Sequence, residues 1–136
     1  MSIFPSVTKE HLASVGIFEG LDDEALDGIA RRCIAIGAHP AAKLVHQGES
    51  GFDFYMIHSG DAAVEVDGER VATLGPGDVF GEMALLGGHH RRTADVVATS
   101  VMSLITMMVW DFREVIEEYP DLGHRLRALA EERLGS

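Results

Sequence analysis

The sequence predicts a mainly β domain, an antiparallel β-roll of the jelly-roll or double-stranded β-helix type, with one N-terminal helix and two C-terminal helices flanking it. Most of the 15 glycines lie between Gly48 and Gly88, where turn residues recur every few positions. Short segments rich in valine, isoleucine, phenylalanine and tyrosine separate these turns, which is typical of many short strands. The two ends of the chain instead place apolar residues at helical spacing, so helices are expected beside the roll.

A helical region is expected over residues 8–37. Its clearest signal is an apolar stripe at i, i+3, i+4 and i+7, formed by Leu26, Ile29, Ala30 and Cys33. Asp22 and Asp23 precede this stripe, where a carboxylate can cap the first turn and interact favourably with the helix dipole. Cys33 is expected to be a small buried apolar residue of the same helix.

The β-roll is expected over residues 38–109, with about eight strands. The segments with clear strand character are residues 44–46, 52–58, 62–66, 70–74, 96–98 and 101–107. Asp67-Gly68 indicates a type I′ hairpin, because both central residues of that turn need a positive φ. Residues 75–78, with the sequence Gly-Pro-Gly-Asp, predict a further tight turn.

Two helices are expected over residues 110–136. The apolar stripe of the first is formed by Phe112, Val115, Ile116 and Tyr119. Pro120 then restarts the pattern, which suits the first turn of a second helix because no amide hydrogen is needed there. The second stripe consists of Leu122, Leu126 and Leu129. Arg133 falls on the same face, where an arginine either extends its charge to solvent or stacks on an aromatic ring.

The composition predicts one globular domain and excludes several classes of function. The length of 136 residues suits a single domain, and 46% hydrophobic with 24% charged residues is ordinary globular composition. The 22 acidic and 11 basic residues give a net charge of −11. This acidic excess argues against a free-standing nucleic-acid binder and against docking to an anionic membrane, because both need a basic face.

Several features favour a cytoplasmic protein. No run of about 20 apolar residues is present, so no membrane-spanning helix is expected. The first ten residues lack a basic region followed by an apolar one, so no signal peptide is expected. Cys33 is the single cysteine, which rules out an intrachain disulfide and suits a reducing compartment.

One segment carries the pattern of an anion-binding site. Gly81 permits close approach of the backbone to a ligand, and the residues from Glu82 onward can form a helical turn with free amides. Arg91 and Arg92 add guanidinium groups, which pair with phosphate oxygens at two points, and Thr93 adds a hydroxyl. Because Glu82 would repel a bare anion, the ligand should also carry a hydroxyl, as a sugar phosphate or a nucleotide does.

Two motifs lie within the expected roll. The first is Leu44-Val45-x-x-Gly48-Glu49-x-Gly51, followed by Phe54-Tyr55-Met56-Ile57 and Gly60. The second is Phe80-Gly81-Glu82-Met83-Ala84-Leu85 and, after a short loop, Arg92-Thr93-Ala94-x-Val96-x-Ala98. In this order and at this distance they resemble the cyclic nucleotide-binding domain family of bacterial catabolite activators, cyclic-nucleotide-dependent kinases and cyclic-nucleotide-gated channels. The resemblance runs from about residue 12 to residue 133, and the second motif is the family's phosphate-binding cassette.

The resemblance implies a role for each cassette residue. Glu82 would accept the ribose 2′-hydroxyl, and Arg92 would pair with the cyclic phosphate. The phosphate would also contact the main-chain amides of Met83 and Ala84, with Gly81 allowing the close approach.

The resemblance also implies how the base is held. Thr93 would touch the phosphate and could reach the amino group of a guanine in the syn conformation, so it is compatible with cAMP and cGMP. Val64, Val71 and Ala72 fall where relatives line the base pocket. The last helix acts as a lid over the base in this family, with Arg133 as its candidate contact.

Arg91 and Arg92 are alternatives for the phosphate contact, because the loop before the arginine varies in length among relatives. Arg92 is favoured, since only this choice keeps Thr93-Ala94 and the following strand in register, and Arg91 is then a charge at the rim. Asp95 stands where many relatives have threonine, serine or an aromatic residue. Strand alternation is expected to turn Asp95 away from the ligand.

The sequence thus predicts a regulatory or sensor domain that binds cAMP or cGMP and has neither enzymatic activity nor a cofactor. Phosphate captured by Arg92 would tighten the cassette, and Leu85 and Leu86 would shift against the helix over residues 112–119. The lid helix would then close over the base. The expected partners are the nucleotide and an effector domain or protein in trans.

Two other functions compete with this one. The first is an interaction module that keeps the fold and has lost the ligand, which Asp95 favours and the intact Glu82 and Arg92 disfavour. The second is a small metal-dependent barrel enzyme. The seven histidines show no metal-ligand spacing, and His89 and His90 are adjacent in a loop, so no metal site and no catalytic residue are expected.

Overall fold

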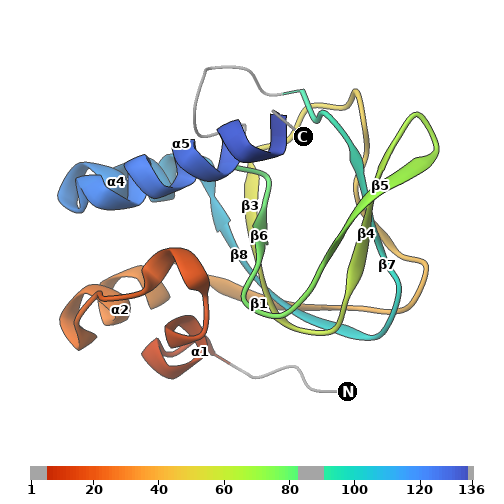
Figure 1. The fold of residues 1–136 in the computed structure, drawn as a ribbon. Coiled ribbons are helices and arrows are strands. Elements are labelled where there is room, and N and C mark those ends of the chain that lie inside the picture. Colours follow the sequence, from red (N-terminus) through yellow and green to blue (C-terminus); the bar gives the residue numbers. More distant parts are fainter. Residues whose placement is uncertain (1–5, 83–90, 135–136) are drawn as a thin grey trace.

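Helices lie beside a roll of strands in the computed structural model, which describes residues 6–82 and 91–134 (Figure 1). The helical elements are α1 (Lys9–Ala13), the 3-10 helix η1 (Gly16–Phe18), α2 (Asp23–Ala30), α4 (Val109–Glu118) and α5 (Pro120–Leu134). The strands are β1 (Ile34–Ala38), β2 (Lys43–Val45), β3 (Asp53–Ser59), β4 (Ala62–Val66), β5 (Glu69–Leu74), β6 (Val79–Phe80), β7 (Asp95–Ala98) and β8 (Met102–Met108). None of the described helices is long and apolar enough to cross a membrane.

The strands form two four-stranded antiparallel sheets that enclose an apolar interior (Figure 1). The strand order is β1-β8-β3-β6 in the first sheet and β2-β7-β4-β5 in the second. Side chains from both sheets fill the interior, among them the fully buried Ile57, Ala62 and Leu104. The predicted antiparallel β-roll with flanking helices is therefore confirmed.

The hairpin between β4 and β5 turns as the sequence predicts. Asp67 has a φ of 54° and Gly68 a φ of 82°, so both central residues adopt the left-handed conformation of a type I′ turn. Strand β5 forms the edge of its sheet and is exposed along most of its length, with Leu74 as its buried end.

The N-terminal region differs from the helix predicted over residues 8–37. Helix α2 ends at Ala30, and Ile34–Ala38 instead form β1, which pairs with β8 along its whole length. The prediction is wrong there because Ile34 and Ile36 stand at alternate positions, a spacing that suits a strand once β8 is available as a partner. The short helices α1 and η1 precede α2 and had no separate signal in the sequence.

The start of α2 agrees with the sequence, but Cys33 does not lie on this helix. The Asp22 side chain caps α2 by accepting a hydrogen bond from the Ala25 amide at 2.9 Å. Cys33 follows the helix end, and its thiol donates to the Ile29 carbonyl at 3.3 Å. Burial raises the pKa of this half-buried thiol to about 12, so it is unreactive at neutral pH.

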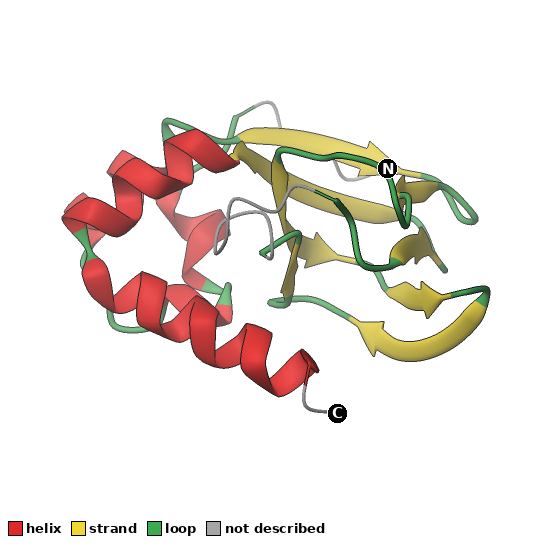
Figure 2. Ribbon diagram, turned by 90° about the horizontal axis from the view of Figure 1, so that it is seen from above, coloured by secondary structure: helices red, strands yellow, loops and turns green. Residues whose placement is uncertain are grey.

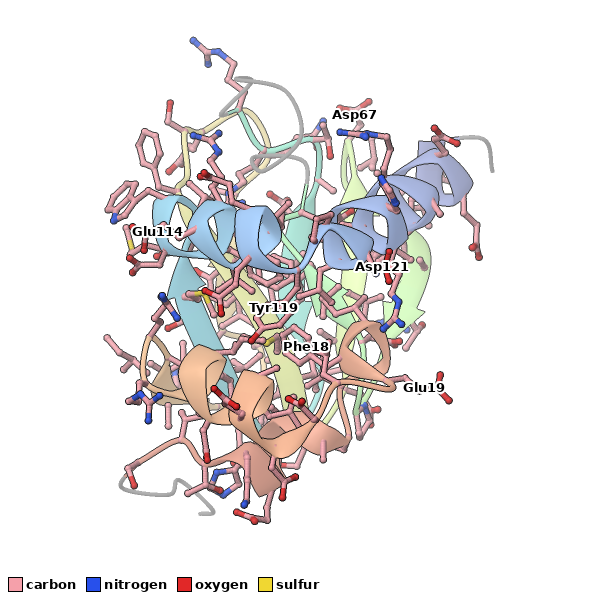
Figure 3. All side chains as sticks on the ribbon, turned by 90° about the vertical axis from the view of Figure 1, so that its left-hand side faces the viewer. Phe18, Glu19, Asp67, Glu114, Tyr119 and Asp121 are labelled. Atoms are coloured by element: carbon pink, nitrogen blue, oxygen red, sulfur yellow. The ribbon has the colours of Figure 1, made fainter. Side chains whose placement is uncertain are left out.

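A second apolar core lies between the first sheet and the helices, which gather on one side of the strands (Figure 2). Phe54 of β3 meets Phe112 of α4 edge to face, with ring centroids 4.7 Å apart, and Phe112 also stacks on Phe18 at 6.2 Å. Figure 3 shows Phe18 and Tyr119 between the N-terminal and C-terminal helices, whereas Glu114 lies at the outer surface. This packing holds α4 against the roll.

The two C-terminal helices are confirmed, and the break between them falls at Tyr119. This residue has φ −128° and ψ 79°, which is not helical, and α5 begins at Pro120 as predicted. Leu122 and Leu126 are fully buried in the helical core. Helix α5 is thereby anchored at its first half, and its last turn reaches the roll.

Candidate functional site

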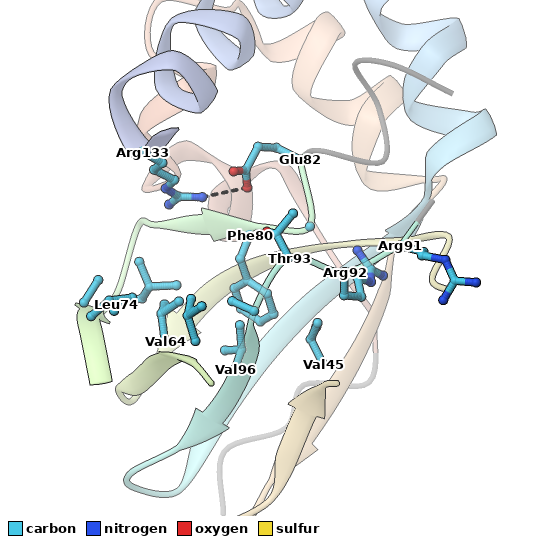
Figure 4. Close-up of a pocket in the computed structure, with 15 residues that line it drawn as sticks. Val45, Val64, Leu74, Phe80, Glu82, Arg91, Arg92, Thr93, Val96 and Arg133 are labelled. Carbon is cyan, nitrogen blue, oxygen red and sulfur yellow. Dashed lines mark hydrogen bonds and ion pairs between the residues drawn. The ribbon is translucent and has the colours of Figure 1, made fainter. Parts of the chain in front are cut away.

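A pocket of about 600 Å³ opens between the second sheet, the segment after β6 and the last turn of α5 (Figure 4). Its lining residues are Val45, Val64, Val66, Val71, Ala72, Leu74, Phe80, Gly81, Glu82, Arg91, Arg92, Thr93, Ala94, Val96 and Arg133. A volume of this size is ordinary for a small-molecule site.

The pocket brings together every sequence-predicted site residue that the structure describes. These residues are Val64, Val71, Ala72, Gly81, Glu82, Arg91, Arg92, Thr93 and Arg133. Met83 and Ala84, whose amides were expected to contact phosphate, lie outside the described residues, as do Leu85 and Leu86.

Six further lining residues were not predicted: Val45, Val66, Leu74, Phe80, Ala94 and Val96. Strand alternation could have found Val66 and Leu74, which lie two residues after the predicted Val64 and Ala72 on β4 and β5. Others reach the pocket through the pairing of β7 with β2 and β4, which joins strands far apart in the sequence.

The main chain of Arg92 is tied to the turn of the first motif. The Arg92 amide donates to the Glu49 carbonyl, and the Arg92 carbonyl accepts from the Gly48 amide, each at 2.8 Å. Nη2 of Arg92 donates to the Asp53 carbonyl at 2.9 Å. A guanidinium has five N–H donors, so this bond leaves donors for an anion in the pocket.

Two glycines, one from each motif, make room for this guanidinium. A Cβ atom at Gly51 would overlap the Arg92 guanidinium. Gly81 has a φ of 87°, and a Cβ there would lie 2.7 Å from the Asp53 carbonyl oxygen and 3.1 Å from Nη1 of Arg92. A side chain at Gly51 would therefore displace the guanidinium from this position, whereas Gly81 needs a residue without a side chain because a Cβ there would meet backbone.

Arg91 has a different environment from Arg92. It is exposed, and its Nη1 donates to the Gly48 carbonyl at 2.7 Å. Figure 4 shows its guanidinium directed away from the apolar lining of the pocket. This geometry favours Arg92 over Arg91 as the anion contact.

Glu82 and Arg133 form an ion pair at the edge of the pocket (Figure 4). Nη1 of Arg133 donates to Oε1 of Glu82 at 2.6 Å, and Nη2 of Arg133 donates to the Val79 carbonyl at 2.7 Å. The Glu82 side chain is 5% exposed and the Arg133 side chain 30%. The sequence did not predict this pair, because helical spacing on α5 says nothing about which part of the roll α5 meets.

The opposite side of the pocket is apolar and partly open to solvent. Val64 is half-buried, whereas Val71 and Ala72 on edge strand β5 are exposed. Phe80, which also lines the pocket, is buried and stacks on Tyr55, with ring centroids 4.7 Å apart. A planar apolar group entering the pocket would meet aliphatic surface here.

Asp95 faces away from the pocket, as strand alternation predicts. Its Oδ1 accepts from the Gln47 amide at 2.7 Å, and its Oδ2 lies 3.3 Å from Nζ of Lys43. The Gln47 hydrogen bond, and secondarily Lys43, lower the pKa of the Asp95 carboxyl. Asp95 therefore gives no reason to infer that the ligand site has been lost.

Metal binding has no support in the described part of the chain. There, no group of three or more histidine, cysteine, aspartate and glutamate side chains could hold a metal ion. His89 and His90 lie outside the described residues.

Three kinds of contact converge on this pocket: a guanidinium with spare donors, a buried carboxylate, and an apolar wall. A guanidinium recognises phosphate oxygens, whereas a carboxylate accepts hydrogen bonds from hydroxyl groups. A ligand that combines an anion, a hydroxyl group and a flat apolar portion would therefore use all three.

Comparison with known proteins agrees with this chemistry. The family model described as the cyclic nucleotide-binding domain matches residues 38–119. The chain is 34% identical over 130 residues to the human cyclic nucleotide-gated channel beta-1, covering 92% of this chain and 10% of the channel. It is 31% identical over 110 residues to the Pycsar effector protein XpPycTIR of Xanthomonas perforans, covering 78% of this chain and 36% of that protein.

Solved structures show the same fold. The Thermus thermophilus catabolite activator protein superposes with a TM-score of 0.76 at 30% identity, covering 87% of this chain and 57% of that one. The regulatory domain of Toxoplasma gondii PKA with cAMP superposes with a TM-score of 0.78 at 25% identity, covering 94% and 49%. The chain thus spans about a tenth of the channel relative and about half of these solved chains.

Proposed function

The chain belongs to the cyclic nucleotide-binding domain family, and from that premise we propose that it is a regulatory domain whose pocket binds cAMP or cGMP. One observation carries the proposal: Arg92, Glu82 and an apolar wall line the same cavity. The three parts of a cyclic nucleotide, its phosphate, ribose and base, match these contacts. The relatives named above include a nucleotide-gated channel and a kinase regulatory domain solved with cAMP.

In this proposal each part of the nucleotide has its own residues. The cyclic phosphate pairs with the Arg92 guanidinium beside Gly81, and the main-chain amides of Met83 and Ala84 complete its site. Glu82 accepts the ribose 2′-hydroxyl. Thr93 contacts the phosphate and, in cGMP, the guanine amino group.

The base lies on the aliphatic side of the pocket against Val64, Val71 and Ala72. Arg91 contributes positive charge at the rim, and Arg133 closes the pocket from α5. No residue of the pocket is assigned a catalytic role, so the domain acts by binding.

Signalling in this proposal passes through α4 and α5. The nucleotide can shift the position of these helices only by binding one arrangement more tightly than another. Arg133 supports this route, since it connects α5 to Glu82 and Val79 directly. The effector, whether a further domain or a protein in trans, reads the new helix position, and we propose that this happens in the cytoplasm.

Isothermal titration calorimetry of the chain with cAMP and cGMP tests the proposal. We expect saturable binding of at least one cyclic nucleotide and much weaker binding of 5′-AMP, which has the same base and ribose but an open phosphate. Absence of saturable binding for both cyclic nucleotides at millimolar concentration would overturn the proposal.

The Thr93→Ala variant tests base selectivity in the same experiment. We expect its affinity for cGMP to fall on the order of 10-fold, because a hydrogen bond to the guanine amino group is lost. Its affinity for cAMP should fall less, since only the phosphate contact changes. Equal losses would remove Thr93 from base recognition.

A further inference from the structure

The side chain of Gln47 joins the turn of the β4–β5 hairpin to the segment that follows β2. Nε2 of Gln47 donates to Oδ1 of Asp67 at 3.1 Å, and Oε1 of Gln47 accepts from the Asp67 amide at 2.8 Å. These two bonds with Asp67 form a hairpin clamp. The main-chain amide of Gln47 donates to Oδ1 of Asp95 at 2.7 Å. One half-buried residue thereby connects the hairpin turn with the start of β7.

The hairpin turn lies beyond the strand pairing that supports the rest of β4. Strand β4 pairs with β7 over residues 62–65, so Val66 and the turn at Asp67 extend past the end of that pairing. Strand β5 pairs with β4 alone within the described residues, because it is the edge of its sheet. The β4–β5 pairing is itself irregular between Val64 and Glu65. The hairpin clamp therefore holds a turn that strand pairing leaves unsupported in the described part of the chain.

The same hairpin carries the wall that the proposed function assigns to the base. Four pocket residues belong to it: Val64, Val66, Val71 and Ala72. The two residues that follow Gln47 hold the Arg92 main chain by hydrogen bonds of 2.8 Å each. Gln47 therefore stands between the arginine assigned to the phosphate and the wall assigned to the base.

We propose that Gln47 is a positioning residue that, through Asp67, sets the width of the pocket on the base side and so determines how large a base the pocket accepts. This role rests on the proposed function and adds a determinant of base size to it. An aliphatic wall offers the base contact area and no hydrogen bond, so its distance from Arg92 decides which base sizes fit. A wall released at its turn can move outward and admit a larger base.

The test compares cAMP with two analogues enlarged at the base, N6-benzyl-cAMP and 8-benzylthio-cAMP, by calorimetric titration of the full chain. Gln47→Glu keeps the length of the side chain, removes the donor to Asp67 and brings two carboxylates together, so it opens the hairpin clamp. We expect the affinity of at least one enlarged analogue, relative to that of cAMP, to rise on the order of fivefold in this variant. A loss of folding stability alone would leave this ratio unchanged.

Three further variants are matched to this one. Gln47→Glu combined with Asp67→Asn exchanges donor and acceptor across the clamp, because asparagine tolerates the positive φ of this turn, and it should restore the wild-type ratio. Gln47→Ala opens the clamp without adding a charge and gives the same test if the glutamate variant does not fold. Thr99→Ala removes a side-chain hydrogen bond to the Asp61 carbonyl, at 3.1 Å, near the opposite end of β4, and should leave the ratio unchanged.

Amide hydrogen exchange without nucleotide tests the clamp separately from the pocket. We expect residues 66–70 to exchange faster in Gln47→Glu than in the wild type, and at the wild-type rate in the double variant. Unchanged exchange in Gln47→Glu would overturn the inference, and so would an affinity ratio that is unchanged, lower or not restored by Asp67→Asn. All of these results would leave the proposed function standing. If the unmodified chain bound no cyclic nucleotide, the proposed function would fail and the role of Gln47 in base selection with it.

Discussion

Arg92 donates a hydrogen bond from Nη2 to the main-chain carbonyl of Asp53, at 2.9 Å. The two residues belong to different parts of the sequence, Asp53 to the start of β3 and Arg92 to the segment before β7. Together with the bonds from the Arg92 main chain to Gly48 and Glu49, this contact fixes the position of the arginine. A preorganised guanidinium spends less conformational entropy on binding a phosphate.

The first prediction follows from this contact. Arg92→Ala should weaken cAMP binding on the order of 100-fold, because a charge-assisted pair with the phosphate is lost. Arg91→Ala should weaken it less than about threefold, since Arg91 is exposed at the rim and its guanidinium is directed away from the apolar lining of the pocket. Calorimetric titration of both variants measures the difference. Equal losses would show that Arg92 has no special role in binding the phosphate.

Gly81 and Gly48 offer a matched pair for a second prediction. Both have a positive φ, 87° and 84°, but a Cβ would meet the Asp53 carbonyl oxygen at Gly81 and nothing within 4 Å at Gly48. Gly48→Ala should cost about 1 kcal/mol of unfolding free energy, from backbone strain alone. Gly81→Ala should cost about 2–3 kcal/mol and should also weaken cAMP binding, because the backbone beside Arg92 must move. Chemical denaturation and calorimetry give the two quantities, and equal destabilisation would mean that the close contact at Gly81 is relieved without cost.

The candidate site could be predicted from the sequence where it is built from contiguous residues. Gly81 and Glu82 follow one another, as do Arg92 and Thr93, so a motif in the sequence is already a cluster in space. Turn chemistry was equally local, and Asp67-Gly68 turned as predicted. These features depend on a few neighbouring residues and little on the rest of the fold.

The remaining features depend on how distant segments meet. The Glu82–Arg133 pair joins residues 51 positions apart, and it forms only because α5 is anchored by Leu122 and Leu126 and extends toward the roll. Strand β1 was mistaken for helix because its partner β8 lies about 70 residues away and outweighs local spacing. In both cases the sequence pattern does not show which distant segment will be the partner.

Asp95 supports a third prediction. Because its carboxylate faces Gln47 and Lys43 outside the pocket, Asp95→Asn should change cAMP affinity less than about twofold. The variant should still be less stable than the wild type at pH 7. The pKa of Asp95 is lowered in the folded state, so its stabilising effect is present above the pKa of the unfolded chain, about 4, and is lost as the pH falls through the lower folded pKa.

Unfolding midpoints measured from pH 7 to pH 3 test this prediction. The difference between Asp95→Asn and the wild type should begin to shrink as the pH falls below about 4, where the Asp95 carboxyl of the unfolded chain takes up a proton before that of the folded one. A difference that is constant with pH would assign the effect to packing. A large loss of cAMP affinity at pH 7 would show that Asp95 contributes to the ligand site after all.

His11 supports the fourth prediction, which concerns stability near neutral pH. Nδ1 of His11 accepts a hydrogen bond from the Thr8 amide at 2.9 Å, which caps α1 and requires that nitrogen to be unprotonated. The ring of His58 lies edge-on at a centroid distance of 5.3 Å. Burial, followed by the charge of His58, lowers the pKa of His11, and Glu10 opposes this in part. Because the unfolded chain then binds a proton more readily than the folded one, stability falls as the pH drops below about 6.5.

His11→Gln keeps a capping acceptor at the same position without a titrating group, so its unfolding midpoint should fall less between pH 7 and pH 5 than that of the wild type. His124→Gln, which removes an exposed histidine from α5, should keep the wild-type dependence. Identical pH profiles for all three proteins would show that folding does not lower the pKa of His11.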